Sequence, residues 1–381
     1  MCARARGGVA GVRMARPSFR IAYVSTHDPH DVRAFSGIAH FACEALRESG
    51  NAVTVLRPPA VHPALVARAC RLTRYALRTW HALRPERFDL VLVMQAAVLG
   101  ALVPRQVPLV YASDITWRVY EGYYPPVYRR PWQLRLRRAL ERRAVQRADL
   151  LVYSSTWASE SAVRDYDVPP ERVAVIPYGA NLPHPPPPLD PRTRTRAAAL
   201  QLLFLGVSWE RKGGAWALEA VRALNRRGIP ARLTLCGCAP PAGTPVPDFV
   251  RLVPFLDKRV PADAARLDAL LREAHFLLLP TRADATPVAF CEANAYGLPV
   301  VTTRTGGIPS VIEDGVNGRM LPLEAGAEDY AEVLARDWED REAYARFSHR
   351  SRQRFEQRLN WSAWAESLHG ALAQRFAAQR N

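Results

Sequence analysis

The chain has 381 residues, which is more than one hydrophobic core usually holds, so two domains are expected. Its 52 lysine and arginine residues outnumber 36 acidic residues and give a formal net charge of +16. Only Lys212 and Lys258 are lysines, and the arginines are spread over the whole chain without a recognised nucleic-acid binding motif. The charge therefore does not predict a nucleic-acid partner.

The first 17 residues are basic, but they lack the apolar run of a signal peptide. We expect residues 1–17 to be a disordered leader, with Met14 as an alternative start. No later run is long and apolar enough to span a bilayer. The six cysteines lie mostly in apolar runs and lack the paired spacing of a zinc site, which is typical of reduced, buried thiols. The sequence thus predicts a cytoplasmic protein without a bound metal.

Residues 18–181 alternate apolar strands with helical or loop segments. The predicted strands are 19–24, 52–56, 89–93, 108–112 and 149–153, and the first predicted helix is 38–46. This alternation is typical of an α/β domain, in which helices cover both faces of a parallel sheet.

The densest basic cluster of the chain is residues 128–143. If this cluster is helical, its arginines flank an apolar set made of Trp132, Leu134, Leu136 and Leu140. Such a surface is either a solvated helix or one that lies on anionic lipid headgroups. A peripheral contact with the inner face of the membrane is therefore one of two open interpretations.

The proline-rich residues 182–198 predict a stiff, extended linker. A second alternating series follows in residues 199–355, with strands at 202–205, 231–236 and 249–253 and a helix at 215–225. In the tail, residues 356–381, an amphipathic helix is expected to cross back over the domain junction. Its apolar stripe consists of Trp361, Trp364, Leu368 and Leu372.

The most informative stretch is 275–321. It predicts a strand at 275–280, a polar loop, a helix that starts at Pro287 and stops at Gly297, and a strand at 300–303. Gly306 and Gly307 then predict a helix start with exposed backbone N–H groups, which favours a phosphate. Asp284 in the loop and Glu292 on the helix both face the carboxyl edge of the sheet, where such folds bind ligands. A carboxylate there accepts hydrogen bonds from neighbouring hydroxyls of a ribose or hexose.

In this order of elements, the chain resembles the retaining glycosyltransferases of family 4 over about residues 19 to 364. The resemblance implies the GT-B fold, in which two Rossmann-like doubly wound α/β domains face a central cleft. The family's acidic pair is matched by Asp284 and Glu292, with aspartate in the first place. By analogy Glu292 holds the ribose of a nucleotide and Asp284 contacts the donor sugar.

The resemblance also implies donor contacts elsewhere. The family's phosphate grip is matched by Gly206 and Lys212, and Arg211 stands in for the arginine that Val207 replaces. In the first domain Ser36 and Gly37 are similar to the family's glycine loop. Asp114 takes the place of a histidine, where it either orients a hydroxyl or caps the loop. The remaining donor-binding positions are Thr286, Pro287, Val288 and Ala289, which lie between the two acidic residues, and the later glycine pair Gly306 and Gly307.

The function implied is transfer of a sugar from a nucleoside-diphosphate donor to a hydroxyl acceptor, without a cofactor or metal. The base, the sugar and the acceptor do not follow from the sequence. Two alternatives stay open. A nonhydrolysing sugar-nucleotide epimerase shares the fold, and the departures at Val207, Asp114 and Asp284 are compatible with a noncatalytic sugar-nucleotide binder.

Overall fold

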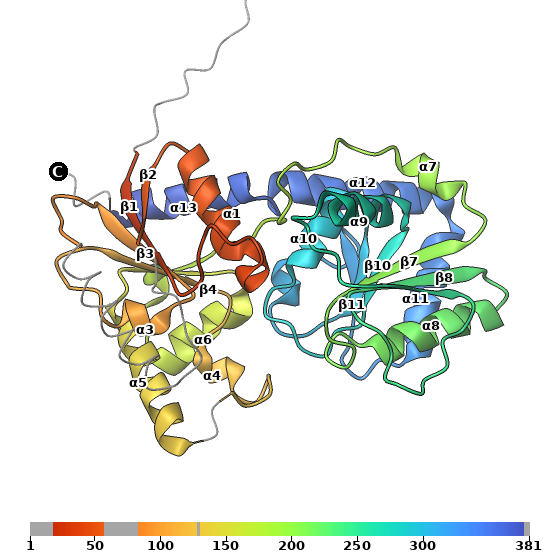
Figure 1. The fold of residues 1–381 in the computed structure, drawn as a ribbon, viewed down its shortest axis with the longest axis horizontal. Helices are drawn as coiled ribbons and strands as arrows, with labels where there is room; N and C mark the ends of the chain where they lie inside the picture. The colour runs from red at the N-terminus through yellow and green to blue at the C-terminus, as the bar shows by residue number, and fades with distance from the viewer. Residues whose placement is uncertain (1–17, 57–82, 128–129, 377–381) are drawn as a thin grey trace, which may run out of the picture.

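The computed structural model describes residues 18–56, 83–127 and 130–376, so the expected leader lies outside the described residues. The chain forms two α/β domains that lie side by side (Figure 1). Each contains a six-stranded sheet in which every strand pairing is parallel. The predicted two-domain α/β fold is therefore confirmed.

The sheet of the first domain has the strand order β2-β1-β3-β4-β5-β6. Its strands are β1 (Arg20–Ser25), β2 (Ala52–Leu56), β3 (Leu90–Met94), β4 (Leu109–Ser113), β5 (Leu150–Tyr153) and β6 (Val173–Val175). Every residue of β3 and β5 is buried, as expected for inner strands covered by helices on both faces. The described helices are α1 (Ile38–Glu48), α3 (Ala97–Gly100), α4 (Trp117–Tyr120), α5 (Pro131–Arg147) and α6 (Thr156–Tyr166), with 3-10 turns η1 (Ala34–Gly37) and η2 (Pro170–Arg172).

The sheet of the second domain has the order β12-β11-β10-β7-β8-β9. Its strands are β7 (Leu200–Leu205), β8 (Ala231–Cys236), β9 (Val250–Val253), β10 (Phe276–Leu279), β11 (Val300–Thr303) and β12 (Gly318–Leu321). The helices around it are α8 (Gly214–Arg226), α9 (Pro261–Glu273), α10 (Val288–Ala295), α11 (Ala327–Glu339) and α12 (Arg341–Gln357), with the 3-10 turn η3 (Ile308–Ser310). β10 lies between β7 and β11, so the loop that follows it opens from the middle of the sheet.

The predicted linker is only partly extended, which corrects the expectation for residues 182–198. Its end forms the short helix α7 (Pro191–Thr195), capped by the Asp190 carboxylate, which accepts from the N–H of Arg192 at 3.0 Å. Arg194 is buried and donates to the carbonyls of Leu271 and Tyr296, both at 3.0 Å. A proline is tolerated in the first helical turn, so Asp190 and Pro191 indicate the start of a helix. The many prolines around them led to the prediction of an extended segment instead.

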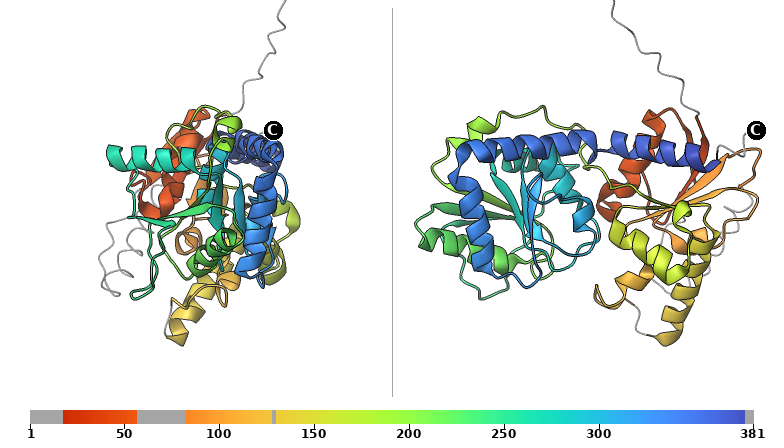
Figure 2. Two further views of the ribbon diagram at one scale, coloured as in Figure 1. Left: turned by 90° about the vertical axis from the view of Figure 1, so that its right-hand side faces the viewer. Right: turned by 180° about the vertical axis from the view of Figure 1, so that it is seen from behind.

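The last two helices run in succession along one side of the molecule, from the second domain to the first (Figure 2). The second of them, α13 (Trp361–Phe376), packs on the core of the first domain through Trp361, Trp364, Leu368 and Leu372. A Cβ atom at Gly179 would lie 2.4 Å from the backbone nitrogen of Trp361. Only glycine at this position allows the start of α13 to lie so close to the backbone of residue 179.

Candidate donor-binding site

Asp284 and Glu292 lie in the loop after β10 and on α10, and both side chains are buried, with residue exposures of 7% and 4%. Each carboxylate forms an ion pair with a lysine. Lys212 pairs with Asp284, and Lys258 pairs with Glu292. The two acidic residues singled out in the sequence are thus matched by the two lysines of the chain.

The Lys212 loop is held against the end of β10 by close backbone contacts. Gly213 has a φ of 76°, and a Cβ atom there would lie 2.0 Å from the carbonyl oxygen of Pro280. The carbonyl of Arg211 accepts from the Thr281 hydroxyl at 3.0 Å. A Cβ atom at Gly206 would lie 3.0 Å from Cγ of Lys212, so this glycine leaves room for the lysine stem. These contacts fix Lys212 opposite Asp284.

Cationic groups gather beside this ion pair. Arg211 Nη1 donates to the carbonyl of Ala283 at 3.0 Å and lies 3.9 Å from the carboxylate of Asp284. The 13-residue helix α8 begins at Gly214, two residues after Lys212, so its positive end opens next to the lysine. A lysine, an arginine and a helix N-terminus together form a chemically suitable place for a diphosphate.

The part of the site around Glu292, called the Glu292 half below, is connected to the segment where the chain passes from the first domain to the second. Lys258 Nζ donates to the backbone carbonyl of Asn181 at 3.2 Å. The amide side chain of Asn181 donates to the carbonyl of Ser36 and accepts from Trp361 Nε1 at 2.8 Å. Asn181 therefore joins the lysine of the second domain to the Ser36 turn and to α13.

Ser36 and Gly37 form a tight turn at the start of α1, where the two domains meet (Figure 1). Both residues have left-handed backbones, with φ of 57° and 86°. A Cβ atom at Gly37 would lie 2.9 Å from the carbonyl of Val32, so the turn needs glycine there.

Asp114 follows β4 and is half-buried. Burial raises the pKa of its carboxyl to about 6, and the charge of Asp284 contributes in the same direction. The side-chain cap of the following helix α4 is supplied by Thr116, whose Oγ1 accepts from the N–H of Val119 at 3.4 Å. Asp114 thus lies near enough to Asp284 to be affected by its charge.

Two of the four positions after Ala285, Thr286 and Val288, contact the first domain. The hydroxyl of Thr286 is hydrogen-bonded to that of Ser154 at 2.6 Å, and Val288 packs into the first domain's core. Pro287 is the N-cap of α10 and not its first helical residue, since its fixed φ also suits that extended position. Ala289 follows within the helix and is half-buried.

The structure corrects the expectation for Gly306 and Gly307. No phosphate-binding helix follows them, because η3 is a single 3-10 turn of three residues. The N–H of Gly307 donates to the carbonyl of Asp284 at 3.2 Å, and a Cβ atom at this glycine would lie 1.8 Å from the carbonyl of Ala285. The glycines are therefore needed for close packing against the Asp284 loop.

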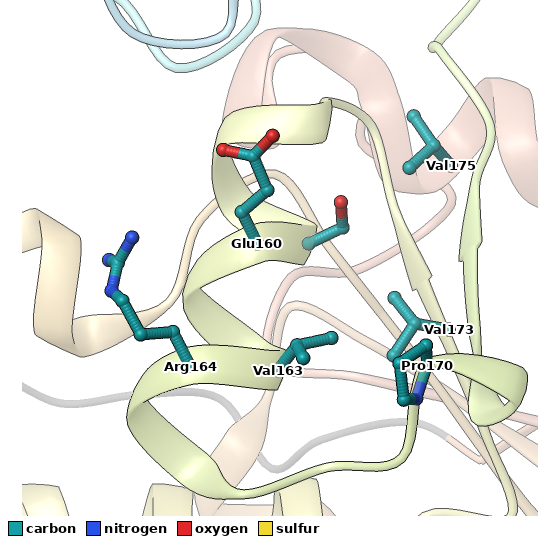
Figure 3. Close-up of a pocket in the computed structure, with 7 residues that line it drawn as sticks. Glu160, Val163, Arg164, Pro170, Val173 and Val175 are labelled. Atoms are coloured by element: carbon teal, nitrogen blue, oxygen red, sulfur yellow. The ribbon is translucent and has the colours of Figure 1, made fainter.

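A separate hollow of about 500 Å³ lies between α6 and the edge strand β6 (Figure 3). Its lining consists of Ser159, Glu160, Val163, Arg164, Pro170, Val173 and Val175. Neither residue of the acidic pair nor either lysine belongs to it, so this hollow lies apart from the candidate donor-binding site.

Sequence reasoning missed three kinds of contact. Lys258 was noticed as one of two lysines but given no role, although its rarity among so many arginines was the available signal. Asn181, which ends the predicted first domain and joins Lys258 to the Ser36 turn, was given no role. Tyr123 and Tyr124, whose hydroxyls reach the Asp284 loop, gave no local signal.

Comparison with known protein families gives two matches that follow one another along the chain. Residues 26–183 match the model described as Glycosyltransferase Family 4, and residues 199–340 match the model described as Glycosyl transferases group 1. The chain therefore belongs to the glycosyltransferase family that these two models describe. The two matched regions correspond to the two domains, so the glycosyltransferase resemblance is confirmed for both.

Among curated proteins, the chain is similar to D-inositol 3-phosphate glycosyltransferases. It is 28% identical to that of Saccharomonospora viridis over 263 residues, which are 63% of this chain and 59% of the relative. It is 30% identical to that of Corynebacterium kroppenstedtii over 204 residues, or 49% of this chain. The chain spans 59% and 45% of the length of these two relatives.

Solved structures show the same fold over nearly the whole chain. Sucrose-phosphate synthase from Thermosynechococcus elongatus superposes with a TM-score of 0.71 at 19% identity, covering 94% of this glycosyltransferase chain and 99% of the synthase. Alr3699/HepE from Anabaena, in complex with UDP-glucose, gives 0.63 at 16% identity and covers 93% and 100% of the two chains.

Proposed function

We propose that the chain is a retaining glycosyltransferase that moves a sugar from a nucleoside-diphosphate donor to a hydroxyl acceptor without a metal ion. The observation that carries this proposal is the paired arrangement at the carboxyl edge of the second sheet. Two buried carboxylates, Asp284 and Glu292, stand beside Lys212, Lys258 and the start of α8. Carboxylates bind sugar hydroxyls, and fixed cations bind a diphosphate.

In the proposed reaction, the bond between the anomeric carbon and the diphosphate oxygen breaks as the acceptor oxygen bonds to the same face of that carbon. The acceptor proton passes to an oxygen of the departing phosphate, and the products are a glycoside and a nucleoside diphosphate. Lys212, Arg211 and the N-terminus of α8 stabilise the charge that builds on the diphosphate. Asp284 and Glu292 orient the saccharide and the ribose.

The similar proteins support the donor class. The Anabaena structure contains UDP-glucose, which makes a nucleotide sugar a reasonable donor for this chain as well. The D-inositol 3-phosphate glycosyltransferases support a small hydroxyl-rich acceptor as one candidate. The first domain, opposite the proposed donor site, would bind the acceptor.

The test is transfer by the full chain, after a screen of UDP-, GDP- and ADP-sugars for thermal stabilisation. With the donor that the screen identifies, Glu292→Gln and Asp284→Asn each reduce transfer at least 100-fold, because they remove a charged acceptor of sugar hydrogen bonds. Glu332→Gln on α11 is an exposed control that leaves transfer unchanged.

Near-normal transfer in both site variants would overturn the assignment. An epimerised sugar nucleotide formed without acceptor would identify an epimerase instead. Donor binding with neither transfer nor hydrolysis would identify a noncatalytic binder.

We also propose a peripheral contact with anionic membranes through α5. Trp132 is 56% exposed and Leu136 is 51% exposed, one helical turn apart, and Arg135 beside them is exposed as well. Basic side chains around exposed apolar ones are typical of helices that rest on lipid headgroups. Among the residues that the structure describes, no helix has the length and apolarity to cross a bilayer.

The membrane proposal is tested by sedimentation with vesicles of phosphatidylcholine and phosphatidylglycerol. The bound fraction of Trp132→Ala/Leu136→Ala falls several-fold relative to the unchanged chain, whereas Leu252→Ala, which removes an exposed side chain of β9, has no effect. Equal binding of all three proteins, or no binding of the unchanged chain, would contradict the contact.

A further inference from the structure

Two tyrosine hydroxyls of the first domain hold the backbone of the Asp284 loop in the second. The N–H of Asp284 donates to Tyr123 Oη at 2.9 Å, and the N–H of Ala285 donates to Tyr124 Oη at 2.8 Å. The Tyr123 hydroxyl is also hydrogen-bonded to that of Thr305 at 2.9 Å. The loop that carries the proposed sugar-binding carboxylate is thus held from across the domain junction.

The segment that carries these tyrosines, residues 116–124, is fixed at its base. Thr116 is fully buried, and its hydroxyl is hydrogen-bonded to that of Ser161 at 2.6 Å. The N–H of Trp117 donates at 2.7 Å to the carboxylate of Glu141, which is 1% exposed on α5. A buried carboxylate with such a partner is costly to move, so the base of the segment is rigid.

A stack of side chains continues from this base to the tyrosines. The guanidinium of Arg137 lies 5.0 Å from the ring centroid of Trp117. The ring of Trp117 stacks on that of Tyr120 at 4.7 Å, and Tyr120 stacks on Tyr124 at 5.1 Å. Because the faces of these rings cover one another, they are poorly placed to stack on a sugar ring. The stack is better suited to hold the tyrosines in position on the base of the segment.

The surface of the second domain around Gly306 fits the Tyr123 hydroxyl closely. A Cβ atom at Gly306 would lie 2.4 Å from Tyr123 Oη and 2.3 Å from the carbonyl of Asp284. Gly306 also has a φ of 52°, so glycine is favoured by both its backbone and its surroundings. The hydroxyl, the Asp284 backbone and the glycine turn therefore form one packed unit.

We infer that Tyr123 and Tyr124 are positioning residues, which set the saccharide half of the donor site by holding the Asp284 loop from the opposite domain. This inference rests on the proposed function. Asp284 has a short side chain, so its reach to a sugar depends on where the backbone lies. The ion pair of Lys258 and Glu292 lies outside this unit, and the tyrosines are expected to affect turnover more than nucleotide affinity.

The test uses Tyr123→Phe, Tyr124→Phe and the double variant in the full chain, since phenylalanine keeps the rings and removes only the hydroxyls. Without ligand, amide hydrogen exchange of Asp284 and Ala285 rises about tenfold in the double variant, because both N–H groups lose their acceptors. Tyr330→Phe is the matched control, since its hydroxyl bonds Thr303 at 2.7 Å within the second domain, and it leaves this exchange unchanged.

In transfer assays with the donor found by the screen, kcat of the double variant falls at least tenfold, while its affinity for the nucleoside diphosphate of that donor stays within about twofold. Thr305→Val keeps both tyrosines, removes one partner of Tyr123 and gives a smaller loss in the same direction. Unchanged exchange in the double variant, or equal losses of kcat and of affinity for that nucleoside diphosphate, would overturn the inference. The exchange measurement needs no sugar donor, so it is decided separately from the proposed function.

Discussion

The two acidic residues of the site are held in different ways. Glu292 lies on α10, and its lysine partner reaches the hinge residue Asn181. Asp284 lies in a loop whose backbone is held by two tyrosines of the first domain. The Glu292 half is therefore built on a helix and tied to the domain crossing, whereas the Asp284 half depends on contacts between the domains.

The two ion pairs also differ in their exposure to water. The side chain of Lys212 is 11% exposed, and that of Lys258 is 36% exposed, although both carboxylate partners are buried. Solvent screens an exposed pair, whereas a buried carboxylate that loses its partner remains uncompensated. The comparison indicates that water screens the Glu292 pair more than the Asp284 pair.

The largest expected effect separates the two lysines. Lys212→Met reduces kcat by about 100- to 1,000-fold, the usual loss when one preorganised charge-stabilising group is removed. Lys258→Met reduces kcat less, by about tenfold, and mainly weakens binding of the nucleoside diphosphate. Steady-state kinetics and calorimetry measure both effects. Lys258→Arg is the control that keeps the charge, and equal losses of kcat at the two lysines would remove the distinction between the halves.

An intermediate effect tests whether the Glu292 half is linked to the hinge. Asn181→Ala removes two hydrogen bonds, to Ser36 and Trp361, and lowers the free energy of unfolding by about 1–3 kcal/mol. It also weakens binding of the nucleoside diphosphate, because the Asn181 carbonyl that accepts from Lys258 is no longer held in place by these two side-chain bonds. Denaturant unfolding and calorimetry measure the two quantities.

The control for this link is Asn225→Ala. Asn225 bonds Val221 and Ala231 within the second domain, with its Nδ2 donating to both carbonyls at 3.0 Å. Its loss lowers stability but leaves nucleotide binding unchanged. If both asparagine variants bind the nucleotide as the unchanged chain does, the hinge and the Glu292 half are independent.

Most of the fold could be predicted because its strands are short apolar runs bounded by turn residues. The strand at 52–56 was predicted with the observed ends, and the one at 89–93 is displaced by one residue. Buried parallel strands have this signature whatever lies beside them. In the candidate site, Asp284, Glu292 and Lys212 stood within recognisable local spacings, so they could be singled out without a structure.

The rest depended on contacts between residues far apart in sequence. Tyr123 meets Asp284 across 161 positions, and no periodicity encodes such a meeting. The Gly306–Gly307 pair was interpreted as a helix start because a glycine pair permits several conformations. In the structure the pair allows the chain to pack closely against the Asp284 loop, a steric demand that only the folded neighbour imposes.

The smallest expected effect concerns the charge that faces the Asp284 half from the first domain. Burial and the nearby Asp284 raise the pKa of Asp114 to about 6, above its usual value of 3.8. Between these pH values the carboxyl of Asp114 is ionised in the unfolded chain but still protonated in the folded chain. The stability from this group is therefore fully present below about pH 4 and is lost as the pH rises through 6.

The variant Asp114→Asn does not titrate, so it has no such loss. Its melting temperature, measured from pH 4 to 7.5, should therefore exceed that of the unchanged chain by a margin that grows with pH and levels off above about pH 7. A margin that stays constant over this range would show that the pKa of Asp114 is not raised in the folded chain, by burial or by the charge of Asp284.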